Sequence, residues 1–252
     1  MDFVGVDGCR SGWFYLGLSE SGDSKHGIVE DDDELVALAA RAKLVLIDIP
    51  IGLKERGESE RSCDVEARRV LGRPRASSVF RVPTRQAVEA RSFETACAEN
   101  YRITGTRLSR QTWHICDKIR QIDRLLRAHP MLRSTFHEMH PEVCFWGLSG
   151  GRAASHNKKS PAGRRERIEI LAKYLPNAEA IADAAAGACR RKDVAWDDIL
   201  DAFAGAVTAR VGYGNLSTLP ANPERDERGL AMEVVFARPG WVAEGESTEN
   251  RR

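Results

Sequence analysis

The strongest constraint on the fold is an uninterrupted apolar run at residues 43–50, KLVLIDIP. A strand that is apolar at every position is typically covered on both faces, as in the parallel sheets of α/β proteins. The run ends in Asp48 and Pro50, so a carboxylate follows the strand where it leaves the sheet. A chain of 252 residues is long enough for such a covered sheet, and suits one large domain or a core with an inserted cap. We expect the second.

The residues before this run predict the edge of the sheet. Residues 2–7 (DFVGVD) alternate, the turn GCRSG follows, and residues 13–19 (WFYLGLS) alternate again, which indicates a hairpin. Residues 26–30 predict a third short strand, and residues 31–42 an amphipathic helix with acids at its start. The order strand, strand, strand, helix, strand predicts a mixed α/β sheet, with an antiparallel opening hairpin beside parallel strands.

The rest of the chain is mainly helical. Residues 52–134 are polar, with clear helices at 61–72 and 110–129, and we expect this segment to be an inserted helical cap over the carboxyl end of the sheet. A strand at 134–141, helices at 164–176 and 196–213, and a last strand at 229–237 follow. The sequence thus predicts a single domain at 1–240, with its insertion at 52–134, and a disordered tail at 241–252.

Composition excludes several classes of protein. The 42% hydrophobic and 30% charged residues are typical of a water-soluble globular chain. We find no signal peptide and no apolar run of the roughly 20 residues that span a bilayer, so we expect a cytoplasmic protein with no membrane partner. The six cysteines are scattered without a C-x-x-C pair, which argues against zinc. A net charge of +1 neither favours nor excludes nucleic acid.

Acidic residues occur where separate elements would present them to one point. Asp7 stands at the end of the first strand and Asp48 at the end of the apolar strand. Each has a simpler interpretation, as a residue of the hairpin turn or a cap of the following turn. Capping does not explain Asp201, which lies one turn inside the predicted helix 196–213, on the same face as Asp198. Small residues follow on that face and permit close packing on a sheet: Ala202, Gly205, Ala206 and Ala209.

A further acidic cluster lies in HEMHPE, residues 137–142. If this segment is a strand, Glu138 and His140 share a face and Glu142 lies just beyond. The alternative is a solvent-facing edge strand. His114 and His137 are most simply packed or exposed residues.

The acidic positions together favour a divalent-metal site. Several carboxylates in one pocket repel one another unless cations neutralise them, and Mg²⁺ or Mn²⁺ prefers such oxygen ligands. We expect Asp7, Asp48 and Asp201 to be metal ligands, with Glu138, Glu142 or Asp198 as an additional ligand or base. Such a site is suited to two-metal phosphoryl displacement.

Several segments are similar to a known family: GVDGCRSGW, LIDIPIGL, CDVEARRVLG, SSVFRVPTR, LSRQT, HPEVCFWGLSGG and DDILDAFAGAVTAR. Over about residues 3–237 the chain resembles the predicted nucleases of domain-of-unknown-function family 429, within the ribonuclease H-like superfamily. The resemblance implies a ribonuclease H-like mixed β-sheet flanked by helices, with a helical insertion between the fourth and fifth strands. It also implies catalytic acids at Asp7, Asp48, Asp198 and Asp201. Asp48 stands where many resolvases of this superfamily carry glutamate. The aspartate side chain is one methylene shorter, so its carboxylate reaches less far toward a metal.

Basic and polar residues are candidates for substrate contacts. The candidates are Arg10, Arg73, Arg75, Ser77, Ser78, Gln111, Lys158 and Lys159. The arginines and lysines are possible contacts to phosphate, and the serines and the glutamine are possible contacts to another part of a ligand. The alternatives are that the charged residues lie on solvated helix faces and that the polar residues form turns or caps.

Three functions remain open from the sequence. The first is a metal-dependent nuclease or phosphodiesterase acting on nucleic acid or another phosphoester. The second is a relative of actin-like ATPases or sugar kinases, because D-G-x-x-x-G at residues 7–12 can be a phosphate-binding hairpin. Those proteins pair two such domains, and we find no second aspartate-glycine hairpin with similar surroundings. The third is a non-catalytic binding scaffold.

Overall fold

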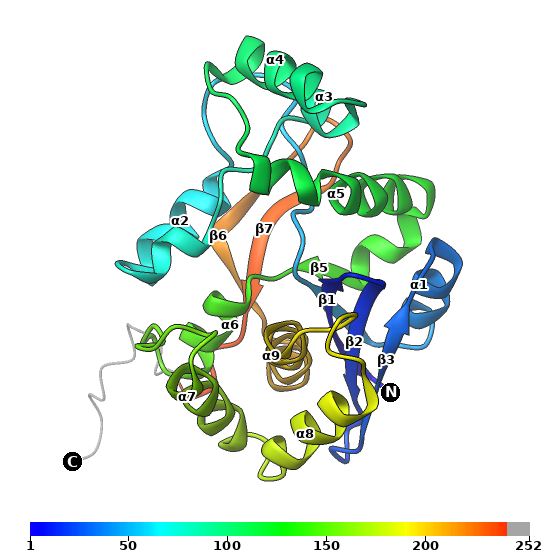
Figure 1. The fold of residues 1–252 in the computed structure, drawn as a ribbon, viewed down its shortest axis with the longest axis vertical. Helices are drawn as coiled ribbons and strands as arrows, with labels where there is room; N and C mark the ends of the chain where they lie inside the picture. The colour runs from blue at the N-terminus through cyan, green and yellow to red at the C-terminus, as the bar shows by residue number, and fades with distance from the viewer. Residues whose placement is uncertain (241–252) are drawn as a thin grey trace, which may run out of the picture.

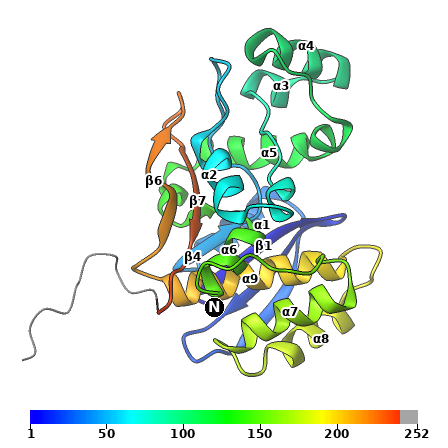
Figure 2. The ribbon, with the colours of Figure 1, turned by 90° about the vertical axis from the view of Figure 1, so that its left-hand side faces the viewer.

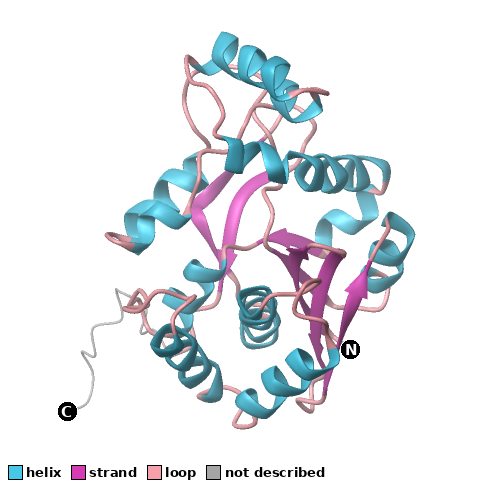
Figure 3. Cartoon of the chain, viewed as in Figure 1, coloured by secondary structure: helices cyan, strands magenta, loops and turns pink. Residues whose placement is uncertain are grey.

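The computed structural model describes residues 1–240, and the expectation of a disordered tail at 241–252 lies outside them. Its main sheet, drawn in Figures 1 and 3, is mixed. The strand order is β3-β2-β1-β4-β5. The strands are β1 (Phe3–Cys9), β2 (Gly12–Leu18), β3 (Ser24–Val29), β4 (Leu44–Ile47) and β5 (Phe136–Glu138). β2 pairs antiparallel with both β1 and β3, while β4 pairs in parallel with both β1 and β5. The predicted mixed sheet with an antiparallel opening hairpin is confirmed.

The apolar run of β4 is covered on both faces, as its sequence predicts. Leu44 and Leu46 belong to a core shared with α9 (Trp196–Gly212), while Val45 and Ile47 face a second core. That second core includes residues of α1 (Asp32–Ala39) and α5 (Arg110–Ala128). All four side chains are at most 5% exposed, which is why no polar residue interrupts the strand.

Helix α9 crosses the sheet directly against β1. A Cβ atom at Gly5 would lie 1.8 Å from the carbonyl oxygen of Ala202 and 2.4 Å from the backbone nitrogen of Ala206. A Cβ at Gly205 would lie 3.0 Å from the Cα of Gly5. Glycine on the strand and small residues on the helix therefore let the two backbones touch (Figure 2). The predicted packing of this small-residue face on the sheet is confirmed.

Residues between β4 and β5 form the helices of the segment predicted as a cap. α3 and α4 lie farther from the sheet than α5 in Figures 1 and 2, and all three helices contribute residues to the second core. The structure supports a helical segment here, which includes the helices expected at 61–72 and 110–129. Its elements are α2 (Ser62–Leu71), η1 (Arg75–Ser78), α3 (Arg85–Glu89), α4 (Phe93–Thr104), α5 and η2 (Pro130–Ser134).

The region after β5 differs from the sequence prediction. The strand expected at 134–141 ends at Glu138, because Pro141 is the first residue of helix α6 (Pro141–Leu148). Glu138 and His140 therefore do not share a strand face. Helix α7 (Pro161–Ala172) is confirmed, and α8 (Ala178–Ala188) is an additional helix.

A separate hairpin closes the described chain. The sequence predicts no strand at 217–225, but β6 (Ser217–Arg225) pairs antiparallel with the predicted last strand, β7 (Ala231–Phe236). Leu219, Met232, Val234 and Phe236 pack with residues of α2 and α6 in a third core. The sequence of β6 contains two prolines and few apolar residues, which hides its strand character.

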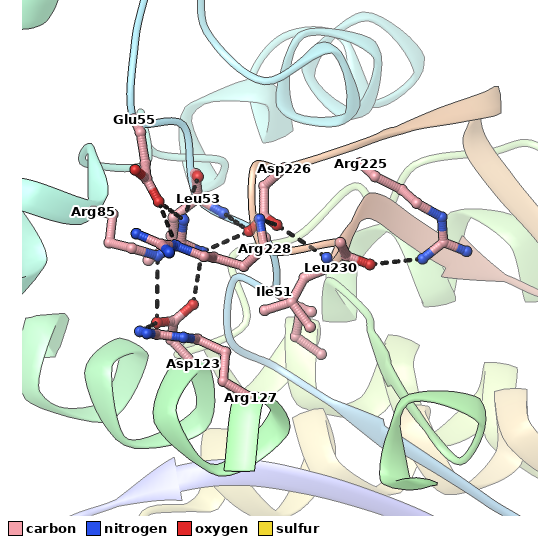
Figure 4. Close-up of polar contacts among 12 residues, drawn as sticks. Ile51, Leu53, Glu55, Arg85, Asp123, Arg127, Arg225, Asp226, Arg228 and Leu230 are labelled. Carbon is pink, nitrogen blue, oxygen red and sulfur yellow. Dashed lines mark hydrogen bonds and ion pairs between the residues drawn. The ribbon is translucent and has the colours of Figure 1, made fainter. Parts of the chain in front are cut away.

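An ion-pair cluster joins this hairpin to the segment between β4 and β5 (Figure 4). Arg85 pairs with Asp226 at 2.6 Å, with Asp123 at 2.8 Å and with Glu55 at 2.6 Å. Asp226 also accepts hydrogen bonds from the backbone nitrogens of Leu53 and Leu230. Because Arg85 and Asp226 are buried, this cluster fixes the hairpin turn against the helical segment.

In the part of the chain that the structure describes, no helix has the length and apolar character needed to cross a membrane.

Candidate metal centre

The register of β1 against β4 places two aspartates side by side. Val6 lies opposite Ile47, and the backbone nitrogen of Asp48 donates to the carbonyl oxygen of Val6 at 2.9 Å. Asp7 and Asp48 therefore follow as neighbours at the carboxyl ends of parallel strands. Alternation along β1 gives Asp7 the same face as Gly5, which is the face that α9 covers.

Helix α9 brings the third carboxylate. Asp201 precedes Ala202, the residue that touches Gly5, so the close contact of helix and strand carries its side chain to the other two. One carboxylate oxygen from each of Asp7, Asp48 and Asp201 lies within 4.8 Å of the others. Asp7 is 9% exposed and Asp201 is 2% exposed, while Asp48 is half-buried. The predicted convergence of these three aspartates, here called the aspartate triad, is confirmed.

Burial and mutual repulsion make the triad costly to ionise. Burial raises the pKa of Asp7 well above its ordinary value, and the charges of Asp48 and Asp201 raise it further. Burial, followed by the charge of Asp201, raises the pKa of Asp48 to about 8. Burial raises the pKa of Asp201 to about 6, although Lys158 partly offsets this effect. A cation at this point would stabilise the charged form of all three carboxylates.

Lys158 already contributes one positive charge. Its ammonium forms a salt bridge with Oδ2 of Asp201. Burial lowers the pKa of Lys158, but the charge and hydrogen bond of Asp201 outweigh burial and raise it. The other oxygen, Oδ1 of Asp201, is buried and has no hydrogen-bond partner among the described residues. A buried, unpartnered carboxylate oxygen beside two more carboxylates is suited to a metal ion.

Glu138 forms a buried ion pair, and its charge also acts on nearby Asp48. Its carboxylate accepts from Arg61 at 2.7 and 2.8 Å and from the backbone nitrogen of Ile51 at 2.6 Å. Arg61 also pairs with Asp64 at 2.6 Å. Burial raises the pKa of Glu138 to about 7, although Arg61 opposes this effect. Its contacts indicate that Glu138 anchors α2 to the end of β5.

The remaining acidic candidates also have local partners. Glu142 pairs with Arg167 of α7, and both residues are buried. Asp198 accepts from the backbone nitrogen of Ala195 at 2.8 Å, which caps the first turn of α9. Burial raises the pKa of Asp198, and its charge acts on Asp7, so it lies close enough to influence the triad.

His140 approaches the carbonyl oxygen of Ser78 at 3.4 Å.

A cleft of about 870 Å³ opens beside the triad. Lys158 lines it and also reaches Asp201, so the cleft and the triad share a side chain. Lys159, Arg164 and Arg165 add positive charge, and the ring of Trp196 forms part of the wall. Acidic residues line the same cleft, and one of them, Asp183, pairs with Arg164: Glu169, Glu179, Asp183 and Asp197. Of the predicted substrate contacts, Lys158 and Lys159 lie here.

The other predicted substrate residues do not line this cleft. Arg75 donates to the carbonyl oxygen of Ser155 at 3.4 Å. The hydroxyls of Ser77 and Ser78 donate to the backbone carbonyls of Pro74 and Arg75 at the start of η1. Arg10, Arg73 and Gln111 are exposed. Their roles in substrate binding stay predictions.

Lys118 is a candidate that sequence reasoning missed. It lies on α5, where its ammonium donates to the carbonyl oxygen of Gly12 at 2.5 Å and sits 4.4 Å from the ring centre of Trp13. A Cβ on Gly8 would come within 2.8 Å of its side chain, so Lys118 lies beside the residue that follows Asp7. Helix α5 carries several other charged residues, and nothing in the sequence distinguishes Lys118 from them as a residue near the site.

Comparison with family models gives one match, which covers residues 5–225 of this chain. The family is described as Protein of unknown function (DUF429). The chain belongs to the DUF429 family. The match spans Asp7, Asp48 and Asp201, the three members of the triad, together with the segment between β4 and β5. Searches of curated proteins and of solved structures found no match.

Proposed function

We propose that this DUF429 protein is a divalent-metal-dependent phosphodiester hydrolase of ribonuclease H-like fold. The observation that carries the proposal is the aspartate triad, whose carboxylate oxygens come from β1, the end of β4 and α9 and lie within 4.8 Å of one another. A set of oxygen donors favours Mg²⁺ or Mn²⁺ over softer metals. Bound there, such an ion supplies an activated water and positive charge opposite the reacting phosphate.

The residues around the triad support a phosphate substrate. Asp7 and Asp201 are buried and pre-positioned by backbone contacts, so they can hold an ion without rearrangement of the sheet. Among both basic and acidic residues, the cleft next to them carries Lys158, Lys159 and Arg165, which can contact phosphate oxygens. Nucleic acid is the substrate class that we propose first, because its successive phosphates can follow a cleft of this size beyond the triad.

The test is a cleavage assay with single-stranded, duplex and branched DNA and RNA in Mg²⁺ or Mn²⁺. Wild type is expected to cleave at least one substrate, and Asp7→Asn and Asp201→Asn each to reduce the rate by about a thousandfold or more, because an amide removes ligand charge. Asp117→Asn is the control, since this carboxylate is 86% exposed on α5. It should leave the rate unchanged.

Two results would contradict the proposal. If Asp7→Asn and Asp201→Asn keep the wild-type rate, the triad does not catalyse the observed cleavage. If wild type cleaves none of the substrates but hydrolyses ATP through the same aspartates, the kinase-like alternative replaces the nuclease proposal.

A further inference from the structure

Lys158 occupies an unusual position for a surface lysine. Its ammonium contacts a carboxylate that is 2% exposed, while its own side chain is 36% exposed and lines the neighbouring cleft. The side chain therefore runs from the cleft into the triad. Two environments are within reach of one flexible side chain, one rich in negative charge and one open to solvent.

The backbone on each side of Lys158 is held in place. The backbone nitrogens of Ser155 and His156 both donate to Glu166, at 2.7 and 2.9 Å. Asn157 accepts from the backbone nitrogen of Ser160 at 2.9 Å, and a Cβ on Gly163 would lie 1.9 Å from the Asn157 carbonyl oxygen. Because the loop is anchored to α7, movement of the ammonium is movement of the side chain alone.

We propose that Lys158 is the internal cation of the metal-free site, and that metal binding expels its ammonium into the cleft, where it binds a substrate phosphate. The inference rests on the proposed metal-binding function. A divalent ion bound by Asp7, Asp48 and Asp201 repels an ammonium at Oδ2 of Asp201 and competes with it for that carboxylate. The unpartnered Oδ1 of Asp201 gives the incoming ion a first contact before Lys158 has left.

The arrangement couples metal loading to substrate binding. Without metal, Lys158 neutralises part of the triad's charge and is withheld from the cleft. With metal, the triad is neutralised by the ion and the cleft gains a positive charge beside Lys159. Binding of metal and binding of phosphate should therefore strengthen one another.

The first experiment measures the reactivity of Lys158 in the wild-type protein. Reductive methylation with formaldehyde is followed by peptide mass spectrometry, with and without saturating Mn²⁺, while calorimetry measures Mn²⁺ uptake. An ammonium paired with a buried carboxylate reacts slowly, so Mn²⁺ should raise the methylation rate of Lys158 by about fivefold or more. Lys159, exposed in the same cleft, should keep its rate. Asp7→Asn should abolish the effect of Mn²⁺.

The outcomes separate the two proposals. Uptake of Mn²⁺ with no change at Lys158 overturns the inference and leaves the metal site standing. Absence of Mn²⁺ uptake overturns the metal site and this inference together.

A second experiment tests the phosphate contact, with adenosine monophosphate as the probe. Lys158→Met should weaken its binding to the Mg²⁺-loaded protein by about fivefold or more, because one charge-assisted phosphate contact is lost. Lys43→Met is the matched control, since Lys43 pairs with Asp2 and Glu20. Unchanged affinity of Lys158→Met, or no binding by wild type, would overturn the phosphate role.

Discussion

At the scale of single residues, the acidic candidates differ in the charge of the side chains next to them. Glu138 and Glu142 are each paired with a buried arginine, whereas the charge that acts most strongly on Asp7 and on Asp48 comes from another aspartate. The sequence could predict Asp201, because an acid inside a helix and before small residues has no local purpose. It could not separate Glu138 from the triad, because its partner Arg61 lies 77 residues away in the chain.

Metal affinity should depend steeply on pH. The folded protein holds protons on Asp48 up to a pKa of about 8 and on Asp201 up to about 6, and burial raises both values. A metal ion must displace these protons, so its affinity should rise as pH increases from 5.5 to 8. We expect a gain of about a hundredfold over this range.

Calorimetric titration with Mg²⁺ at a series of pH values measures this dependence. Folding stability depends on pH in the opposite direction to metal affinity. Without metal, the raised carboxyl pKa values make the native state lose stability as pH rises. The melting temperature of the metal-free protein should therefore fall over the same pH range in which the metal affinity rises. A metal affinity independent of pH would contradict protonation of the metal-free triad.

Glu138→Gln should affect folding rather than metal binding. The change removes one negative charge beside the buried Arg61 and should lower the free energy of unfolding by about 3 kcal/mol. The hydrogen bonds of Glu138 go to Arg61 and Ile51, and its charge acts on Asp48 less than that of Asp201 does. The Mg²⁺ dissociation constant should therefore change by less than about threefold. Denaturant unfolding and calorimetry measure the two effects.

Asp7→Asn is the matched comparison and should give the reverse pattern. It removes a mutually repelling charge, so metal-free stability should be kept or increased while Mg²⁺ binding is lost. If Glu138→Gln instead removed metal binding at full stability, Glu138 would be a ligand, as one sequence hypothesis held.

At the scale of secondary-structure elements, the crossing of α9 over β1 determines the geometry of the triad. The sequence predicts this contact from small residues on one helix face, and the structure confirms it at Gly5. Helix α6 and strand β6 were missed for local reasons. Pro141 converts an apparent strand into a helix start, and β6 is stabilised by pairing with β7 and by packing on α2 rather than by its own residues.

Gly5→Ala should test this crossing. Its added methyl group would lie 1.8 Å from the Ala202 backbone, so helix and strand must separate. We expect a loss of about 3 kcal/mol in the free energy of unfolding and weaker Mg²⁺ binding, because Asp201 moves with α9.

Gly187→Ala provides the control in another helix. Nothing lies within 4 Å of the added methyl group on α8, so alanine should stabilise the protein by about 0.5 kcal/mol. Equal stability of both variants in denaturant unfolding would contradict the close contact of α9 and β1.

At the scale of the whole molecule, the order of elements was predictable but their long-range connections were not. The pattern of residues 1–50 predicts the sheet edge, since hairpins and buried strands have strong local signals. The hairpin of β6 and β7 is joined to residues 53–123 through Arg85, Asp123 and Asp226. No periodicity encodes such pairing, because each residue alone resembles a solvated charge.

The central claim is that Asp7, Asp48 and Asp201 bind one divalent ion or more. The most direct measurement is anomalous X-ray diffraction from crystals of the wild-type protein soaked in Mn²⁺. An anomalous peak is expected between the three carboxylates, at about 2.1 Å from an oxygen of each. A well-ordered triad with no peak at saturating Mn²⁺, or with Lys158 still bound to Asp201 and the ion elsewhere, would contradict it.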